Sequence, residues 1–207
     1  MEITTVSGPS FFLREIYLSC VSVTDIVEGA VLNEDQTADI IEAGLCFVVE
    51  QKALEYLNRS EQCSFNLKRK LLAKGHSKKC IDLALAYLES KNYLSDERFA
   101  RVWLNNRKIN HSEGRIKLLS ELLVRGISKN VAEKVLDDFF NENSEEEMCI
   151  KAYKKCVKLK KTEEKIISYL INSGFSVKLV NRARDLYHEK YGSFDYPEED
   201  YVCPNDL

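Results

Sequence analysis

A helix–glycine–helix pattern recurs three times along this chain and constrains its fold more than any other feature. Gly75, Gly126 and Gly174 anchor the three copies and lie 51 and 48 residues apart. An apolar residue stands four and eight positions before each glycine, and a serine stands two positions after it. Apolar residues follow again five and nine positions after each glycine. Agreement at six positions in three copies indicates an internal repeat.

Each copy predicts two helices joined by a short turn. Apolar residues spaced by four share one face of a helix, and a left-handed glycine ends that helix. The serine then caps the next helix by accepting a backbone N–H bond. A third helix precedes this pair in every copy. In the middle copy it begins after Ser95, and Phe99 and Trp103 belong to its apolar stripe, where we expect core residues.

The sequence therefore predicts a mainly all-α protein, in which three tandem three-helix repeats stack in an elongated, curved array. The expected repeats cover residues 45–92, 93–142 and 143–190. Residues 1–44 predict an acidic N-terminal segment, with short strands or irregular chain at 11–18 and 21–27 and a helix start at Asn33 and Gln36. Residues 191–207 form an acidic tail, which we expect to be disordered.

Composition excludes several classes of protein. The seven cysteines form no CxxC pair, and residues 1–10 lack the basic start and apolar core of a signal peptide. We therefore expect reduced cysteines in a cytoplasmic protein. The chain has no run of about eighteen apolar residues, which argues against a transmembrane span.

No catalytic or metal motif occurs in the sequence. The three histidines are scattered, without an HExxH pair, and neither a glycine-rich phosphate loop nor a GxSxG motif is present. Two acidic pairs, Asp96–Glu97 and Glu163–Glu164, fall in predicted first helical turns, where the helix dipole already accounts for them. We therefore expect no enzymatic activity, no cofactor and no metal.

The net charge of the chain is only −3, but acidic and basic blocks alternate along it. Residues 1–51 carry −8, 52–134 carry +9, 135–150 carry −6, 151–190 carry +7 and 191–207 carry −5. Because screening acts over about 8 Å in cells, a partner senses the local block rather than the mean. An ordinary solvated helix surface explains any single lysine. The alternation of five blocks is explained equally well by such a surface and by an anionic partner.

The basic blocks supply the candidate binding residues. Four lysines of the third repeat fall at i, i+3, i+4 and i+7, so they share one helix face that suits phosphates or an acidic protein groove. The full candidate set is Lys68, Arg69, Lys70, Arg98, Arg101, Arg107, Lys108, Arg115, Lys117, Arg125, Lys151, Lys154, Lys155 and Lys158.

Two short blocks of the middle copy carry a family resemblance. They are Tyr93–Ala100 (YLSDERFA) and Glu121–Ile127 (ELLVRGI), with Arg115–Ile116 between them. Together with Lys70–Gly75 (KLLAKG), they resemble the RecX family of bacterial recombination regulators over about residues 45–190. The family pattern runs Leu-Asp-Asp-x-Arg-Phe-Ala, then Arg-Ile, Glu-Leu and Lys/Arg-Gly-Ile.

This chain departs from the family pattern at two places. Ser95 replaces the first aspartate of the family block, which preserves a helix cap. Asn110–Glu113 replace the family's Gly-x-Gly-Pro turn, and we expect Ser112 to cap the helix that follows.

The resemblance implies a fold that lies in the groove of a RecA–DNA filament. It implies a protein that modulates RecA, typically inhibiting strand exchange and filament extension in DNA repair, recombination and the SOS response. Weaker contact with single- or double-stranded DNA is implied too, and we expect a monomer without a membrane partner. Two alternatives stay open: a stand-alone helical-repeat DNA-binding or adaptor protein, and a scaffold that binds only protein.

Overall fold

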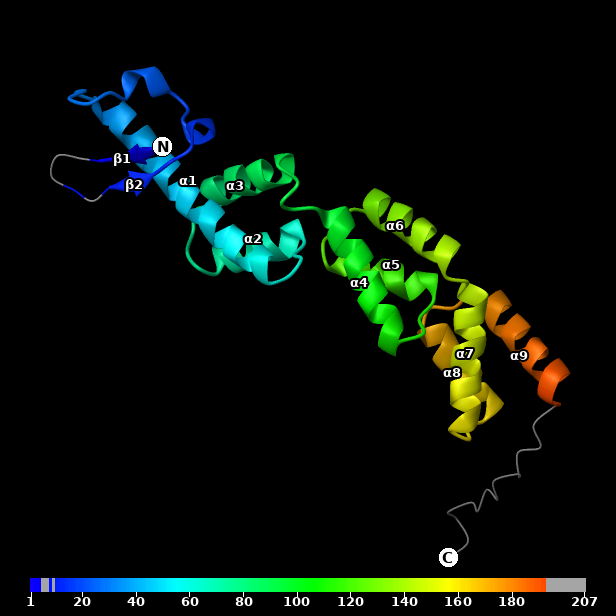
Figure 1. Cartoon of the computed structure of the whole chain (residues 1–207). Coiled ribbons are helices and arrows are strands. Elements are labelled where there is room, and N and C mark those ends of the chain that lie inside the picture. Colours follow the sequence, from blue (N-terminus) through cyan, green and yellow to red (C-terminus); the bar gives the residue numbers. More distant parts are fainter. Residues whose placement is uncertain (5–7, 9, 193–207) are drawn as a thin grey trace, which may run out of the picture. The chain divides into compact units, whose positions relative to one another are not determined.

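The structure is a computed structural model that describes residues 1–4, 8 and 10–192. Helices dominate these residues, as predicted, and one small two-stranded sheet accompanies them (Figure 1). The elements in chain order are β1 (Glu2–Ile3), β2 (Phe11–Phe12), η1 (Glu15–Tyr17), η2 (Val23–Asp25), α1 (Glu34–Arg59), α2 (Ser64–Leu72), α3 (Lys78–Ser90), α4 (Asp96–Asn110), α5 (Arg115–Val124), α6 (Lys129–Glu142), α7 (Glu145–Lys158), α8 (Glu163–Asn172) and α9 (Val177–Tyr191). The predicted disorder of the acidic tail lies outside the described residues, apart from Tyr191 and Gly192.

The helix–glycine–helix prediction is confirmed. The three anchor glycines adopt positive φ angles of 82°, 82° and 87°, the left-handed conformation that ends a helix. Ser77 accepts a bond from the N–H of Cys80, and Ser176 accepts one from Leu179, so both serines cap the helices that follow. The local sequence therefore determines each turn.

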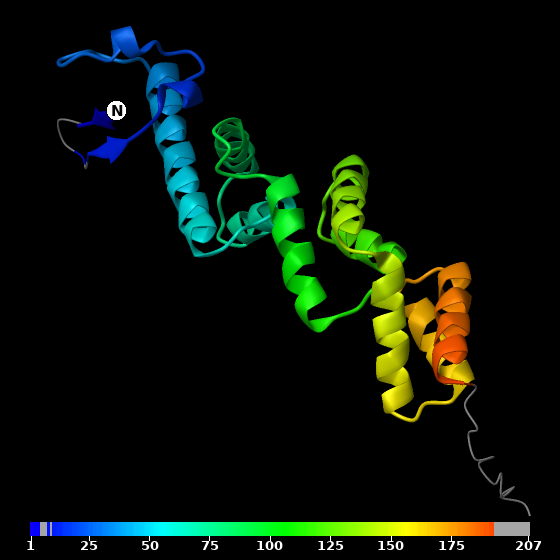
Figure 2. The same ribbon diagram turned by 45° about the vertical axis from the view of Figure 1, so that its right-hand side comes forward.

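The long helix α1 begins where the sequence predicts. Asn33 and Gln36 form a reciprocal capping box at its start. The helix then continues unbroken for 26 residues (Figure 2), so the predicted division between residues 44 and 45 falls inside it. Gly44 lies inside this helix, and its missing side chain makes room for Phe11. A Cβ there would lie 2.7 Å from the ring.

The N-terminal segment is largely irregular rather than extended. Of the two stretches 11–18 and 21–27, only Phe11–Phe12 forms a strand, paired antiparallel with Glu2–Ile3. Each stretch contains a 3-10 helix, Glu15–Tyr17 or Val23–Asp25, and between the stretches the buried carboxylate of Asp39 in α1 accepts the backbone N–H groups of Ser19, Cys20 and Val21 at 3.0–3.1 Å. Donors used in this way are not free to form a strand ladder.

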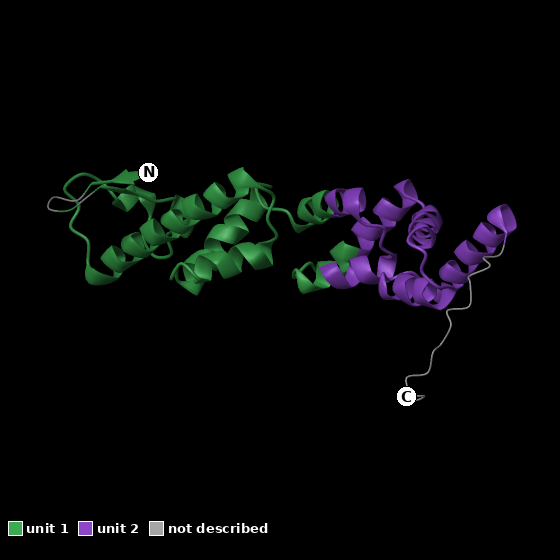
Figure 3. Ribbon diagram, turned by 90° about the horizontal axis from the view of Figure 1, so that it is seen from below, with its two compact units in different colours: residues 1–103, 122–132 green, residues 104–121, 133–207 purple. Residues whose placement is uncertain are grey.

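The described residues form two compact units (Figure 3). Unit 1 contains residues 1–103 and 122–132, and unit 2 contains residues 104–121 and those from 133 onward. The division passes through α4, α5 and α6, so it does not follow the repeat boundaries, which stay a prediction. No helix among the described residues is long and apolar enough to cross a membrane.

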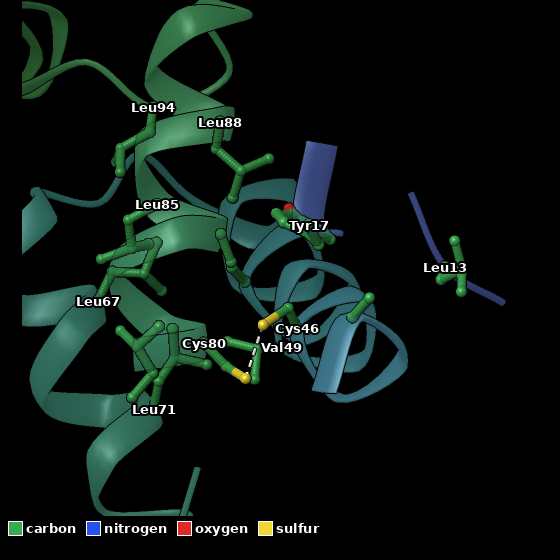
Figure 4. Close-up of a cluster of buried hydrophobic side chains, with 14 of the residues drawn as sticks. Leu13, Tyr17, Cys46, Val49, Leu67, Leu71, Cys80, Leu85, Leu88 and Leu94 are labelled. Atoms are coloured by element: carbon green, nitrogen blue, oxygen red, sulfur yellow. Dashed lines mark hydrogen bonds between the residues drawn. The ribbon is translucent and has the colours of Figure 1, made fainter. Parts of the chain in front are cut away.

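Each unit has its own hydrophobic core. The core of unit 1 joins the N-terminal segment to α1, α2 and α3 through residues such as Leu13, Val49 and Leu71 (Figure 4). The thiols of Cys46 and Cys80 form a hydrogen bond across it, and burial raises the pKa of Cys46 to about 12. The core of unit 2 lies between α7, α8 and α9, where Tyr153 and Phe175 are its largest fully buried side chains.

Candidate anion-binding cleft

Unit 2 contains a cleft of about 740 Å³ that gathers six of the predicted lysines. Residues from the end of α4, the loop before α5, and helices α5, α7 and α8 line it. Apolar side chains, including Ile109, Ile150 and Tyr169, lie among the charges. We call this site the lysine cleft, after Lys108, Lys117, Lys151, Lys154, Lys155 and Lys158.

Helix α7 presents four of these lysines because its two faces differ in character. Cys149, Ala152, Tyr153 and Cys156 are buried in the core of unit 2, which leaves the lysines on the other side. Three glutamates fill the first turn, and Ser144 caps it by accepting a bond from the Glu147 N–H. Acids at the start and lysines toward the end both suit the helix dipole, so the cationic face costs the helix little.

Glu113 is the one buried carboxylate in the cleft. It accepts two bonds from Arg107, at 2.6 and 2.9 Å, and its second oxygen lies 2.8 Å from the ammonium group of Lys117. Burial alone would raise its pKa, but the hydrogen bonds from Arg107 and Lys117 outweigh this and lower the pKa to about 2. Glu113 therefore pairs with both Arg107 and Lys117 and balances one of their two charges, and the other five lysines add to the positive field.

Two long-range contacts fix the start of α5, one with the turn between α8 and α9 and one with α7. The N–H of Gly114 donates to the carbonyl of Ser173 at 2.9 Å, and a Cβ on Gly114 would lie only 2.2 Å from the Gly174 carbonyl oxygen. The carboxylate of Glu145 accepts the N–H of Arg115 at 2.8 Å, at the first residue of α5. The predicted cap by Ser112 is therefore wrong, because an acid from α7 takes that role.

The remaining predicted residues of unit 2 serve its own packing. Arg115 forms an ion pair with Asp137, and Lys108 donates to Asn143 at 2.9 Å while it lines the cleft. Arg107 is bound to Glu113, as described above. Of these, Lys108 is an exposed residue that lines the cleft together with the α7 lysines.

The predicted residues of unit 1 do not line the lysine cleft. Most of them contact a neighbouring side chain. Three form ion pairs, Lys68 with Asp82, Arg98 with Glu61 and Arg101 with Glu97. Lys70 donates a hydrogen bond to Gln62, and the guanidinium of Arg125 lies 4.5 Å from the centroid of the Trp103 ring. Arg69 is exposed.

Sequence reasoning missed the acids that shape the cleft. Glu113 and Glu145 were not among the candidates, because neither residue belongs to a recognisable motif. The spacing Glu113–Lys117 is a helical i, i+4 pair that could have suggested one of these contacts. Among the described residues, no group of three or more His, Cys, Asp or Glu side chains could hold a metal ion.

Comparisons with known proteins identify the relatives of this chain. The family model for the second three-helix domain of RecX matches residues 95–136. A protein named "Regulatory protein RecX" from Treponema pallidum is 36% identical over 122 residues, which cover 59% of this chain and 74% of the relative. Another of the same name, from Clostridium acetobutylicum, is 26% identical over 79% of this chain and 81% of its own length.

Two solved structures share the fold. "Crystal structure of regulatory protein RecX" matches with a TM-score of 0.69 and 20% identity over 77% of this chain and 81% of that one. The RecX structure from Lactobacillus salivarius matches with a TM-score of 0.61 and 18% identity over 69% and 96%. The helical repeats, the matched middle domain and the identity to the Treponema protein lead to one conclusion: this chain belongs to the RecX family of regulatory proteins.

Proposed function

We propose that this protein binds the filament that RecA forms on DNA and restrains strand exchange and filament extension. Membership of the RecX family supports a regulator of this kind. The observation that carries the proposal is the lysine cleft, because it is a concave cationic surface that an anionic partner can enter. Five of its six lysines are not committed to the Glu113 carboxylate.

The geometry of α7 suits an extended anionic partner. Lys151 and Lys158 lie seven residues apart, which corresponds to about 10 Å along a helix. Lys154 and Lys155 lie between them on the same face. A row of ammonium groups of this length can follow consecutive phosphates or a run of carboxylates. Ile150 and Tyr169 add apolar contact area next to the charges.

Co-sedimentation tests the partner directly. We expect the protein to pellet with preformed RecA filaments and to bind the same DNA more weakly when RecA is absent. We also expect it to slow RecA-driven strand exchange or ATP turnover at substoichiometric amounts. Failure to act on preformed filaments would contradict the proposal.

Charge reversal tests the surface. The triple variant Lys151→Glu, Lys154→Glu and Lys155→Glu should lower filament affinity at least tenfold, since each lost phosphate contact also removes counterion release. A matched variant reverses Lys74, Lys78 and Lys91, which are exposed lysines of unit 1 outside the cleft. Circular dichroism should be unchanged in both variants. Equal losses in the two would reject the cleft as the binding surface.

A stand-alone DNA-binding protein is the second candidate, and the same lysines favour it. In that case affinity for naked DNA would match the affinity for the filament and fall steeply with salt, with a slope near −0.7 to −0.9 per lysine contact. The comparison with and without RecA separates the two functions.

A further inference from the structure

We propose that the acidic tail beyond α9, residues 193–207, binds the lysine cleft of its own chain and competes there with the anionic partner. This inference deepens the proposed function and rests on it, since it takes the cleft as the surface that receives that partner. Three observations support it: the opposite charges of the tail and the cleft, the aromatic or apolar side chains in both, and the attachment of the tail next to a lysine of the cleft.

The chemistry of the tail complements that of the cleft. Residues 193–207 contain no basic side chain, and their acids are Asp195, Glu198, Glu199, Asp200 and Asp206. Phe194, Tyr196 and Tyr201 alternate with these acids. The cleft offers the matching groups, with lysines that surround Ile109, Ile150 and Tyr169. Opposite charge steers the two together, and the apolar side chains provide area to bury.

The tail is attached beside the cleft. Tyr191 is the last residue of α9, and the ammonium group of Lys154, a residue of the cleft, lies 5.6 Å from the centroid of its ring. Asp195 follows four residues later, within about 14 Å of extended chain. Because Lys151 and Lys158 are only about 10 Å apart on α7, the acids of the tail can reach the whole row.

Attachment at this place makes the tail an effective competitor. A short tether gives a bound segment an effective concentration in the millimolar range. An external partner then binds only those molecules whose cleft is open, so its apparent Kd rises in inverse proportion to the open fraction. If the tail fills the cleft in nine molecules of ten, the apparent Kd is about tenfold higher than that of the open cleft.

Zero-length cross-linking of the full chain tests the contact itself. A carbodiimide joins a carboxylate to a lysine only where the two touch, and mass spectrometry locates the bond. We expect bonds from the tail acids to Lys151, Lys154, Lys155 or Lys158, formed within one chain when ¹⁴N- and ¹⁵N-labelled protein are mixed. The ion pair of Lys79 and Glu42, at 2.6 Å, serves as the internal standard. If the standard forms and the tail bonds do not, the inference is overturned.

Binding of a fluorescent twenty-nucleotide oligothymidylate tests the consequence. Neutralising the tail with Asp195→Asn, Glu198→Gln, Glu199→Gln and Asp200→Asn should tighten binding about tenfold at low salt and much less at high salt. A control removes four exposed acids of the N-terminal segment instead, through Glu2→Gln, Glu15→Gln, Asp25→Asn and Glu28→Gln.

An equal gain in both variants would indicate general repulsion and overturn the inference, as would no gain in the tail variant. Neither assay contains RecA, so the two proposals can fail separately. A protein with intact tail cross-links and no effect on RecA filaments would reject the proposed function alone.

Discussion

Glu50 is a fully buried carboxylate that is held by two residues of the N-terminal segment, the cationic Arg14 and the neutral Tyr17. Arg14 donates two hydrogen bonds to it, at 2.6 and 2.7 Å, and the hydroxyl of Tyr17 donates a third at 2.9 Å. The guanidinium of Arg14 also lies over the ring of Tyr87, 4.7 Å from its centroid. Burial and the Glu50 carboxylate hold the pKa of Tyr17 well above its usual value, so its hydroxyl stays a donor. These contacts attach the N-terminal segment to α1.

Replacing Glu50 by Gln should destabilise the protein by about 3 kcal/mol, because the half-buried guanidinium loses its counter-charge. Urea unfolding measures this. The control is Glu55→Gln, which breaks the exposed pair with Lys52 and should cost less than about 1 kcal/mol. A similar cost for both substitutions would show that the Glu50 cluster contributes little beyond a surface pair.

Glu113 predicts a pH dependence of stability in unit 2. Its pKa is about 2 in the folded protein and ordinarily 4.5, so its bonds stabilise the fold fully above pH 4.5 and are lost as the pH falls toward 2. The contribution at neutral pH is up to about 3 kcal/mol. We expect urea unfolding to show this difference between wild type and Glu113→Gln at pH 6, and less than half of it at pH 3. A gap that is constant with pH would contradict the assignment.

At the scale of the elements, a helix of one repeat is capped by an acid from the next. Asp96, the first residue of α4, accepts the N–H and the hydroxyl of Ser64 at the start of α2, at 2.7 and 2.9 Å. Glu145, the first residue of α7, accepts the N–H of Arg115 at the start of α5. The two contacts are equivalent in successive repeats. At the start of α2, where Cys63 provides no side-chain cap, Asp96 satisfies an N-terminal donor.

Substituting Asp96 by Ala should therefore cost about 1–2 kcal/mol, and Asn at that position should recover part of it through its amide oxygen. Hydrogen exchange followed by NMR should show the amide of Ser64 exchanging faster. Asp35→Ala is the matched control, since Asp35 is exposed in the first turn of α1 and should lose only a dipole contribution of about 0.3–1 kcal/mol. An unchanged Ser64 amide would rule out the cap.

The sequence predicts the glycine turns but not the contacts of Asp96 and Glu145 with the helices of the preceding repeat. The turns at Gly75, Gly126 and Gly174 follow from local patterns, because the glycine, the apolar spacing and the serine all lie within nine residues of the turn. The roles of Asp96 and Glu145 depend on residues about thirty positions away, which no local pattern indicates. The lysine face of α7 was predictable, whereas its closure into a cleft by Lys108 and Lys117 required the packing of Gly114 against Gly174.

At the scale of the whole molecule, unit 1 and unit 2 each contain a separate cluster of buried apolar side chains. The core of unit 1 contains Leu71, fully buried, and the core of unit 2 contains Phe175, 1% exposed. In a repeat protein, stability is approximately a sum of local and neighbouring terms, so loss of one core need not open the other. The lysine cleft lies wholly within unit 2 and depends on the second core.

Hydrogen–deuterium exchange with mass spectrometry tests this independence. Leu71→Ala should cost about 2–5 kcal/mol and accelerate exchange in α1–α3, while α7–α9 keep their wild-type rates. Phe175→Ala should cost about 3–5 kcal/mol and do the reverse. Because the cleft belongs to unit 2, only Phe175→Ala should also weaken filament binding. Equal acceleration of all helices in either variant would mean that the chain unfolds as one cooperative body, and the cleft would then depend on both cores alike.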